Sequence, residues 1–252
     1  MKTPEIDVSV LLSPPDILSC KRVLCIQPHP DDNEIGMGGT IALLARGGCE
    51  VHYLTVTPGD QGSRDPVRGP AETAVLRREE AVAAGRFLGA KEFHFLDHGD
   101  GTLADVVGLS REIASAIRRI RPEAIFCPDP WLCYEAHYDH VVTGRAAANA
   151  FHMSGGLFFD GADTGPWQAR AIGFYFTANP NTVIDISLFF ETKFSAIALH
   201  KSQMDPQTLA LYRLYFWMKG EELARGRGFE LGEGLKILGP LHTHCFVDAI
   251  GL

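Results

Sequence analysis

A short segment directly after an apolar run carries more charge than a turn requires. The segment QPHPDDNEIG, residues 27–36, contains His29, Asp31, Asp32 and Glu34. Three carboxyl groups this close together repel one another and lose hydration at a cost, unless a positive charge lies among them. A divalent cation is the simplest such charge, because a histidine and a carboxylate three residues apart can both face a metal where a strand turns into a helix.

A second segment, WLCYEAHYDH, supplies further metal-binding side chains. His137 and His140 lie three residues apart where a loop is expected to enter a helix. Catalytic zinc sites typically have three protein ligands and one open position, so one histidine can bind the metal while the other faces the substrate. On its own, the segment fits equally well an Asp139 helix cap between two surface histidines. Together with PHPDD on a neighbouring strand end, it favours a shared metal site.

Alternating strands and helices are expected to position both segments. The pattern predicts strands near residues 22–27, 51–57, 93–97, 124–128, 171–177 and 182–187, and helices near 38–46, 72–89, 109–121, 139–151, 188–203 and 206–226. This alternation indicates one α/β domain over residues 1–252, with a Rossmann-like, mostly parallel sheet and helices on both faces. Such sheets bind ligands at the carboxyl ends of their strands, so both charged segments should lie on the same edge.

The composition narrows the possible partners and compartment. The chain has 252 residues, of which 46% are hydrophobic, and this is enough for one sizeable core. Its net charge of −8 and scattered basic residues argue against nucleic acid and anionic membranes as partners. There is no signal-peptide pattern and no uncharged apolar run long enough to span a bilayer. Six cysteines without a CxxC pair predict a reduced, cytoplasmic protein.

Other common catalytic motifs are missing from the sequence. It contains no HExxH motif and no EF-hand loop, which disfavours a zincin helix and a calcium site. The glycines of GMGG lack the GxGxxG spacing of dinucleotide-binding proteins, and aspartates precede them where a pyrophosphate would have to approach. Serine hydrolysis would require a GxSxG elbow, which is also missing.

The motifs PHPDDNE, GGT and HYDH resemble those of the PIG-L/LmbE-like family of zinc-dependent N-deacetylases, which act on acetylated amino sugars. The segments LTVTPGDQGS, LRREEAVAAGRFLGA, FLDHGDGTL and HKSQ extend the resemblance over most of the chain. The segments DPWLCYEAHYDHVVTGRAA and LGPLHTHCF look most similar to the diacetylchitobiose deacetylase branch. The resemblance implies a Zn²⁺ cofactor and a homo-oligomer, either a trimer or a hexamer.

The resemblance also implies a role for each residue of the two motifs. His29, Asp32 and His140 match the three metal ligands of the family. Asp31 matches its general base, and His137 matches the histidine that faces the substrate as an acid and oxyanion stabiliser. The implied reaction is removal of the acetyl group from N-acetylglucosamine or N,N'-diacetylchitobiose, with release of acetate.

Several further residues are candidates with weaker support. Asp139 is expected to hydrogen-bond to one of the two imidazoles of HYDH and so to orient it. Glu34 either holds His29 or caps the helix. The loop residue Arg64 is a possible substrate contact. Further candidates are Asp60, Arg68, Trp131, His242 and His244. One of the last two histidines could reach the active site of a neighbouring subunit, by analogy with the oligomers of the resembling branch.

Two alternative functions stay open at this point. One is deacetylation or amide cleavage on a thiol-linked sugar conjugate or another small amide. The other is a metal-containing sugar-binding protein without turnover. Asp31 and His137 argue against the second alternative, because binding alone needs neither a spare base nor a spare acid.

Overall fold

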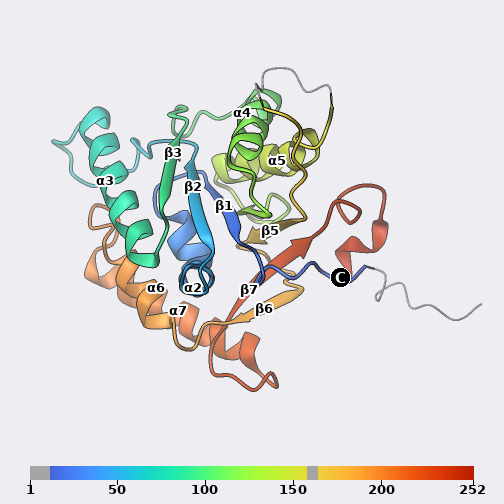
Figure 1. The fold of residues 1–252 in the computed structure, drawn as a ribbon. Helices are drawn as coiled ribbons and strands as arrows, with labels where there is room; N and C mark the ends of the chain where they lie inside the picture. Colours follow the sequence, from blue (N-terminus) through green and yellow to red (C-terminus); the bar gives the residue numbers. More distant parts are fainter. Residues whose placement is uncertain (1–11, 158–163) are drawn as a thin grey trace, which may run out of the picture.

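Seven strands form one sheet at the centre of the computed structural model, which describes residues 12–157 and 164–252 (Figure 1). The spatial order of the strands is β3-β2-β1-β4-β5-β7-β6. Their bounds are β1 Arg22–Gln27, β2 Glu50–Thr55, β3 Glu92–Phe95, β4 Ala124–Pro128, β5 Ala171–Tyr175, β6 Thr182–Asp185 and β7 Gly232–Leu238. Strands β1 to β5 run parallel, whereas β7 is antiparallel to both β5 and β6. The predicted α/β fold with a mostly parallel sheet is confirmed.

Helices cover both faces of this sheet (Figure 1). One face carries α2 (Asp32–Arg46), α3 (Pro70–Leu88), α6 (Phe190–Ile197) and α7 (Pro206–Ala224). The other face carries α4 (Val106–Ile120) and α5 (Tyr138–Met153), and a short 3₁₀ helix, Val247–Ile250, lies near the carboxyl terminus. Strands covered on both faces are apolar at nearly every position, which explains continuous runs such as RVLCI.

The two cores are separated by the alternation of side chains along each strand. In β1, Val23 and Cys25 pack into the core beneath α2, α3 and α6, while Leu24 and Ile26 pack beneath α4 and α5. All four side chains are fully buried. Because β1 is fixed from both sides, the residues that follow its carboxyl end are held on a rigid support.

Helix α2 begins earlier than the sequence pattern suggested. Its first residue is Asp32, whereas the glycine-rich segment predicted a start near Gly38. Met37 interrupts the helix with non-helical backbone angles, φ −148° and ψ 28°. The helix therefore consists of a short first segment that carries charged residues and a longer second segment that begins where the sequence predicted.

The start of the second segment is capped by a distant strand. The carboxylate of Glu233, in β7, accepts hydrogen bonds from the amides of Gly39 and Thr40, at 3.3 and 2.7 Å. Lys193 of α6 pairs with the same carboxylate at 2.6 Å, and both side chains are buried. Glu233 thus satisfies helix amides that lose their usual partners at the interruption.

Strand β7 was not identified from the sequence. Two of its first three residues, Gly232 and Gly234, weaken the strand signal because glycine is rare in strands. A Cβ atom at Gly232 would lie 2.6 Å from Val183, and one at Gly234 would lie 3.1 Å from Pro180. These glycines allow neighbouring chain segments to approach closely, which the local sequence does not reveal.

None of the helices in the described part of the chain is both long enough and apolar enough to cross a membrane. All six cysteines lie in the described residues and carry free thiols.

Candidate active site

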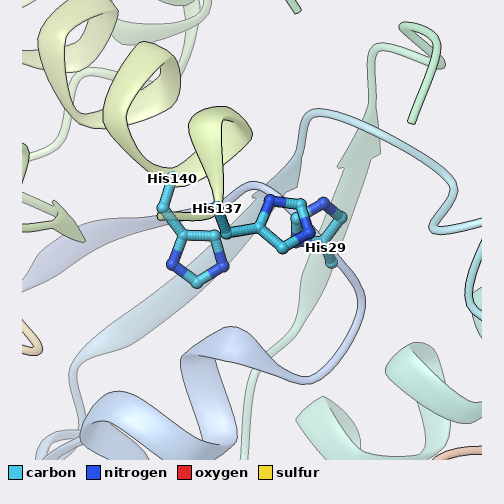
Figure 2. A group of neighbouring side chains, drawn as sticks. All are labelled: His29, His137 and His140. Atoms are coloured by element: carbon cyan, nitrogen blue, oxygen red, sulfur yellow. The ribbon is translucent and has the colours of Figure 1, made fainter. Parts of the chain in front are cut away.

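Three histidines from two segments meet at the carboxyl edge of the sheet. His29 follows β1, while His137 and His140 lie at the start of α5, and Figure 2 shows their rings grouped together. The ring centroid of His29 is 4.4 Å from that of His137 and 5.4 Å from that of His140. The sequence therefore located both halves of this group correctly, on neighbouring strand ends.

Asp32 lies between two of these histidines. Its Oδ2 atom is 3.3 Å from Nδ1 of His29, and its Oδ1 atom is 3.3 Å from Nε2 of His140. The amide of His29 also donates a hydrogen bond to Oδ2, at 2.8 Å. Burial opposes ionisation of Asp32, but the charge of His140 and the hydrogen bonds from both histidines hold its pKa well below the usual range.

The other ring nitrogen of His29 contacts two further carboxylates. Nε2 is 3.2 Å from Oδ1 of Asp100 and 3.3 Å from Oδ2 of Asp139. The amide of Gly101 donates to the same Asp139 oxygen at 2.7 Å, which fixes this carboxylate in place. Burial lowers the pKa of His29, but hydrogen bonds to Asp100, Asp139 and Asp32 outweigh it and raise the pKa to about 11. The carboxylate of Asp139 therefore contacts His29, and its role in orienting an imidazole stays a prediction.

Asp31 differs from its neighbour Asp32 in backbone, partner and pKa. Its φ of 123° lies in the left-handed region, which is unfavourable for a non-glycine residue. Its carboxylate points to Arg77 of α3, with Oδ2 and Nη2 3.3 Å apart. Burial raises the pKa of Asp31 to about 6, against the opposing charge of Arg77.

His137 is the most accessible of the three histidines and faces the cavity. Its pKa is lowered, first by burial and then by the nearby charges of His29 and His140. A lowered pKa favours the neutral imidazole, and the role of His137 as an acid stays a prediction.

Glu34 has neither of the partners proposed from the sequence. It is fully buried, and its Oε2 atom accepts a hydrogen bond from Nε2 of His200 at 3.2 Å. His200 is also fully buried, and its contact with Glu34 is a polar contact inside the core.

One large cavity contains the reactive groups. Its volume is about 1190 Å³, and its walls include Asp31, Asp32 and the three histidines at one end and side chains of α7 at the other. Arg64 also lies in its wall, where it forms an ion pair with Asp205 at 2.6 Å. This volume slightly exceeds the range of about 300–1,000 Å³ that is typical of small-molecule sites.

The five weaker candidates do not line this cavity in the single chain. Trp131 packs edge-on against Phe174 and beneath the guanidinium of Arg145. His242 accepts a hydrogen bond from the amide of Gly239, and His244 lies beside His152. The other two are loop residues with local partners: Asp60 accepts from Gln61, and Arg68 pairs with Asp65. Their contact with a substrate stays a prediction.

Sequence reasoning missed two residues at the centre of the site. Arg77 lies in a helix with several arginines, so its sequence context does not single it out. Its buried position on the helix does, because buried arginines almost always have a charged partner. Asp100 follows β3, the neighbour of β2, and the strand-end rule that found His29 could have found it.

The donor atoms of the site fit a divalent metal. The carboxylates of Asp32, Asp100 and Asp139 crowd around His29, and Glu135 lies 3.4 Å from Nδ1 of His140. Donor atoms of His29, His137 and His140 lie within 4.8 Å of one another, as do those of His29, Asp100 and Asp139. Imidazole nitrogens combined with carboxylate oxygens are the ligands of catalytic zinc sites.

Comparison with known proteins agrees with these features. The profile of the PIG-L family, described as GlcNAc-PI de-N-acetylase, matches residues 24–151. Diacetylchitobiose deacetylase of Thermococcus kodakarensis is 36% identical over 89% of this chain and 85% of its own length. A probable N-acetyl-alpha-D-glucosaminyl L-malate deacetylase 2 of Bacillus cereus is 30% identical over 73% of this chain and 84% of its own length.

A solved structure shares the whole fold. N,N'-diacetylchitobiose deacetylase from Pyrococcus horikoshii, in complex with its inhibitor MPG, is 32% identical with a TM-score of 0.88. The match covers 98% of this chain and 99% of that one. The resemblance noted in the sequence is confirmed, and this chain belongs to the PIG-L family.

Proposed function

We propose that this protein hydrolyses the N-acetyl group of an N-acetylglucosamine-type sugar and releases acetate. The observation that carries the proposal is the division between two adjacent aspartates. Asp32 bridges two imidazoles, whereas Asp31 points to Arg77 and opens into the same cavity. One carboxylate is thus suited to hold a cation, and the other to move a proton beside it.

His29, Asp32 and His140 are the residues that would hold Zn²⁺. Nδ1 of His29 faces Asp32, while Nε2 faces Asp100 and Asp139. Metal-binding histidines usually donate their second ring N–H to a carboxylate, so these two aspartates support Nδ1 as the ligand atom. Zinc in such a site supplies Lewis acidity, which polarises an amide carbonyl and makes water more acidic.

Asp31 and His137 would carry the protons of the hydrolysis. A water oxygen bonds to the amide carbon while Asp31 takes a proton from that water. The carbon–nitrogen bond then breaks, and the nitrogen gains a proton through His137, which leaves acetate and a free amine. A pKa of about 6 keeps Asp31 ionised at neutral pH and therefore able to accept this proton. The position of Asp31 at Arg77, rather than between the histidines, keeps its carboxylate free for this task.

The relatives indicate which part of the substrate is shared. One is named for diacetylchitobiose and another for N-acetyl-alpha-D-glucosaminyl L-malate, so both names contain an N-acetylated glucosamine with a different attached group. We infer that the acetylated sugar lies at the histidines and that the attached group occupies the rest of the cavity. Its volume of about 1190 Å³ supports this division.

Self-association and the cytoplasmic location stay proposals. Helix α7 exposes several large apolar side chains to solvent, namely Leu211, Leu214, Tyr215 and Met218. Exposed apolar patches commonly mark contacts between proteins, which supports the expected trimer or hexamer. Light scattering coupled to size-exclusion chromatography measures the oligomeric mass directly.

One experiment tests the proposed reaction. The purified chain is analysed for bound zinc and assayed for acetate release from N-acetylglucosamine, N,N'-diacetylchitobiose and a thiol-linked N-acetylglucosamine conjugate. Acetate from one of the first two substrates supports the proposal, and acetate from the conjugate alone supports the alternative substrate class. Zinc-loaded protein that releases no acetate from any of them would overturn the proposed function in favour of sugar binding without turnover.

A further inference from the structure

A turn behind the catalytic carboxylates joins three separate segments. The turn is HKSQ, residues 200–203, between α6 and α7. His200 donates a hydrogen bond to Glu34 in the first segment of α2, at 3.2 Å. Gln203 donates to the carbonyl of Gly62, in the loop between β2 and α3, at 3.0 Å.

The third attachment of the turn is made to α3. The amide and hydroxyl of Ser202 donate to the two oxygens of Glu80, at 2.9 and 2.6 Å. Arg77 lies one helical turn earlier on the same side of α3, where residues three apart are neighbours. Its guanidinium donates to the carbonyls of Pro30 and Gly59, at 2.7 and 2.9 Å. Helix α3 therefore holds both the loop before α2 and the turn that contacts α2.

These contacts surround a strained residue. Asp31 has a φ of 123°, which costs about 1–3 kcal/mol for a residue other than glycine and persists only when its surroundings enforce it. Arg77 holds the peptide before Asp31, through the carbonyl of Pro30. On the other side, the carbonyl of Asp31 accepts the amide of Ile35, and Glu34 in the same helical turn is held by His200.

Burying the charged pair of Glu34 and His200 costs solvation free energy. We therefore look for its role in fixing geometry rather than in stabilising the fold. Both side chains have 0% exposure. Buried ion pairs contribute little net stability compared with apolar residues of similar volume, but they fix geometry because an unpaired charge is strongly disfavoured. Neither residue lines the cavity, so neither can contact the substrate directly.

We propose that Glu34, Arg77, Glu80 and the 200–203 turn act as a clamp that holds Asp31 in its strained conformation, with Glu34 and His200 as positioning residues. The clamp rests on the proposed function, because it assigns a purpose to the placement of the proton acceptor. The clamp predicts that weakening the contact between Glu34 and His200 misplaces Asp31 and so lowers turnover. Substrate affinity and metal content should stay unchanged.

The test uses two variants of His200 and one of Glu34 in the full-length, zinc-loaded protein. His200→Leu removes the hydrogen bond, while His200→Gln keeps a donor in its place. Glu34→Gln is a second way to weaken the pair if His200→Leu does not fold. His152→Leu is the matched control, because this histidine also makes one side-chain hydrogen bond, to Thr243, far along α5. All variants are compared by kcat, KM, zinc content and thermal unfolding.

We expect His200→Leu to lower kcat by about ten- to hundredfold, since small displacements of a reacting group cost this much. KM and zinc content should stay at the wild-type level, and His200→Gln should recover most of the turnover. In an Asp31→Asn background, His200→Leu should cause little further loss, because both changes act on the same proton transfer. An undiminished kcat, a loss of zinc, or a full additional loss in the Asp31→Asn background would overturn the clamp.

A second measurement does not depend on catalysis. Amide hydrogen exchange in residues 27–36 should become faster in His200→Leu and Glu34→Gln, and stay unchanged in His152→Leu. Faster exchange in a protein that releases no acetate would support the clamp while the proposed function fails. Unchanged exchange in residues 27–36 would overturn the clamp even if the wild-type protein is an active deacetylase.

Discussion

Two groups of buried charges contact the first segment of α2 or the loop before it, and they differ in the partners of their carboxylates. The histidine–aspartate cluster is composed of His29, Asp32, Asp100, Asp139 and His140. In it, three carboxylates converge on the single imidazole of His29. In the clamp, both oxygens of Glu80 accept hydrogen bonds from Ser202, and one oxygen of Glu34 accepts a hydrogen bond from His200.

This difference separates the proposed metal site from the proposed support. Carboxylates that converge on one imidazole favour a cation among them, whereas each carboxylate of the clamp contacts a partner of its own. Asp31 and Asp32 are adjacent in sequence, yet they fall on opposite sides of this division. Counting the partners of each buried charge therefore distinguishes the two aspartates better than their sequence does.

The largest expected effect comes from removing the proposed proton acceptor, Asp31. Asp31→Asn should lower kcat by about 10²–10⁴-fold, the usual contribution of general base catalysis, while zinc stays bound. The matched change Asp32→Asn should instead reduce zinc content, because Asp32 contacts both histidines. Acetate release and zinc analysis on both variants measure the contrast. Near wild-type turnover in Asp31→Asn would remove the assigned base.

A second prediction concerns a balanced pair that supports α2 beyond its interruption. Lys193→Met leaves the carboxylate of Glu233 buried without its cation, which should destabilise the protein by about 3–5 kcal/mol. Denaturant unfolding measures this loss. The double variant Lys193→Met with Glu233→Gln should regain part of the stability, since no unpaired charge is left. A single variant as stable as wild type would show that the pair is not needed.

The third prediction uses the unbalanced cluster. Without metal, the pKa of His29 is raised to about 11, so this imidazole is protonated at neutral pH. A metal ligand must be unprotonated, and a proton therefore competes with the metal at every pH below this pKa. Zinc affinity of the metal-free protein should rise by about tenfold per pH unit for each proton displaced.

Competition with a chelator between pH 6 and 8, corrected for the protonation of the chelator, measures this dependence. The His200→Gln variant serves as a control, because the clamp carries no metal ligand and should leave the slope unchanged. An affinity that does not vary with pH would contradict proton competition at His29.

The sequence revealed those parts of the site whose residues are close together in the chain. PHPDD and HYDH each place several reactive groups within a few residues, and parallel strands bring the two motifs to one edge. Arg77, Asp100 and His200 each act on a residue far away in sequence, so no motif of neighbouring residues marks them. The helix position of Arg77 and the strand-end position of Asp100 are weaker signals. Glu34 illustrates the limit, because its partner lies 166 positions later.

The fold shows the same limit. The parallel part of the sheet follows from the alternation of strands and helices, which is visible in short windows of sequence. Strand β7 and the interruption of α2 at Met37 are in contact, because Glu233 of β7 caps the helix after the interruption. Neither feature could be predicted without knowing that these distant segments meet.

The smallest expected effect concerns a residue that belongs to neither group. Trp131 is half exposed and packs against Phe174, with the Arg145 guanidinium 4.6 Å from its ring centre. Because it lies outside the cavity of its own chain, Trp131→Ala should change KM by less than about twofold. Trp131→Phe is the control that keeps a ring in the same packing. Steady-state kinetics with N,N'-diacetylchitobiose measure both variants. A large rise in KM for Trp131→Ala, restored by Trp131→Phe, would instead place Trp131 on the substrate, as the sequence analysis allowed.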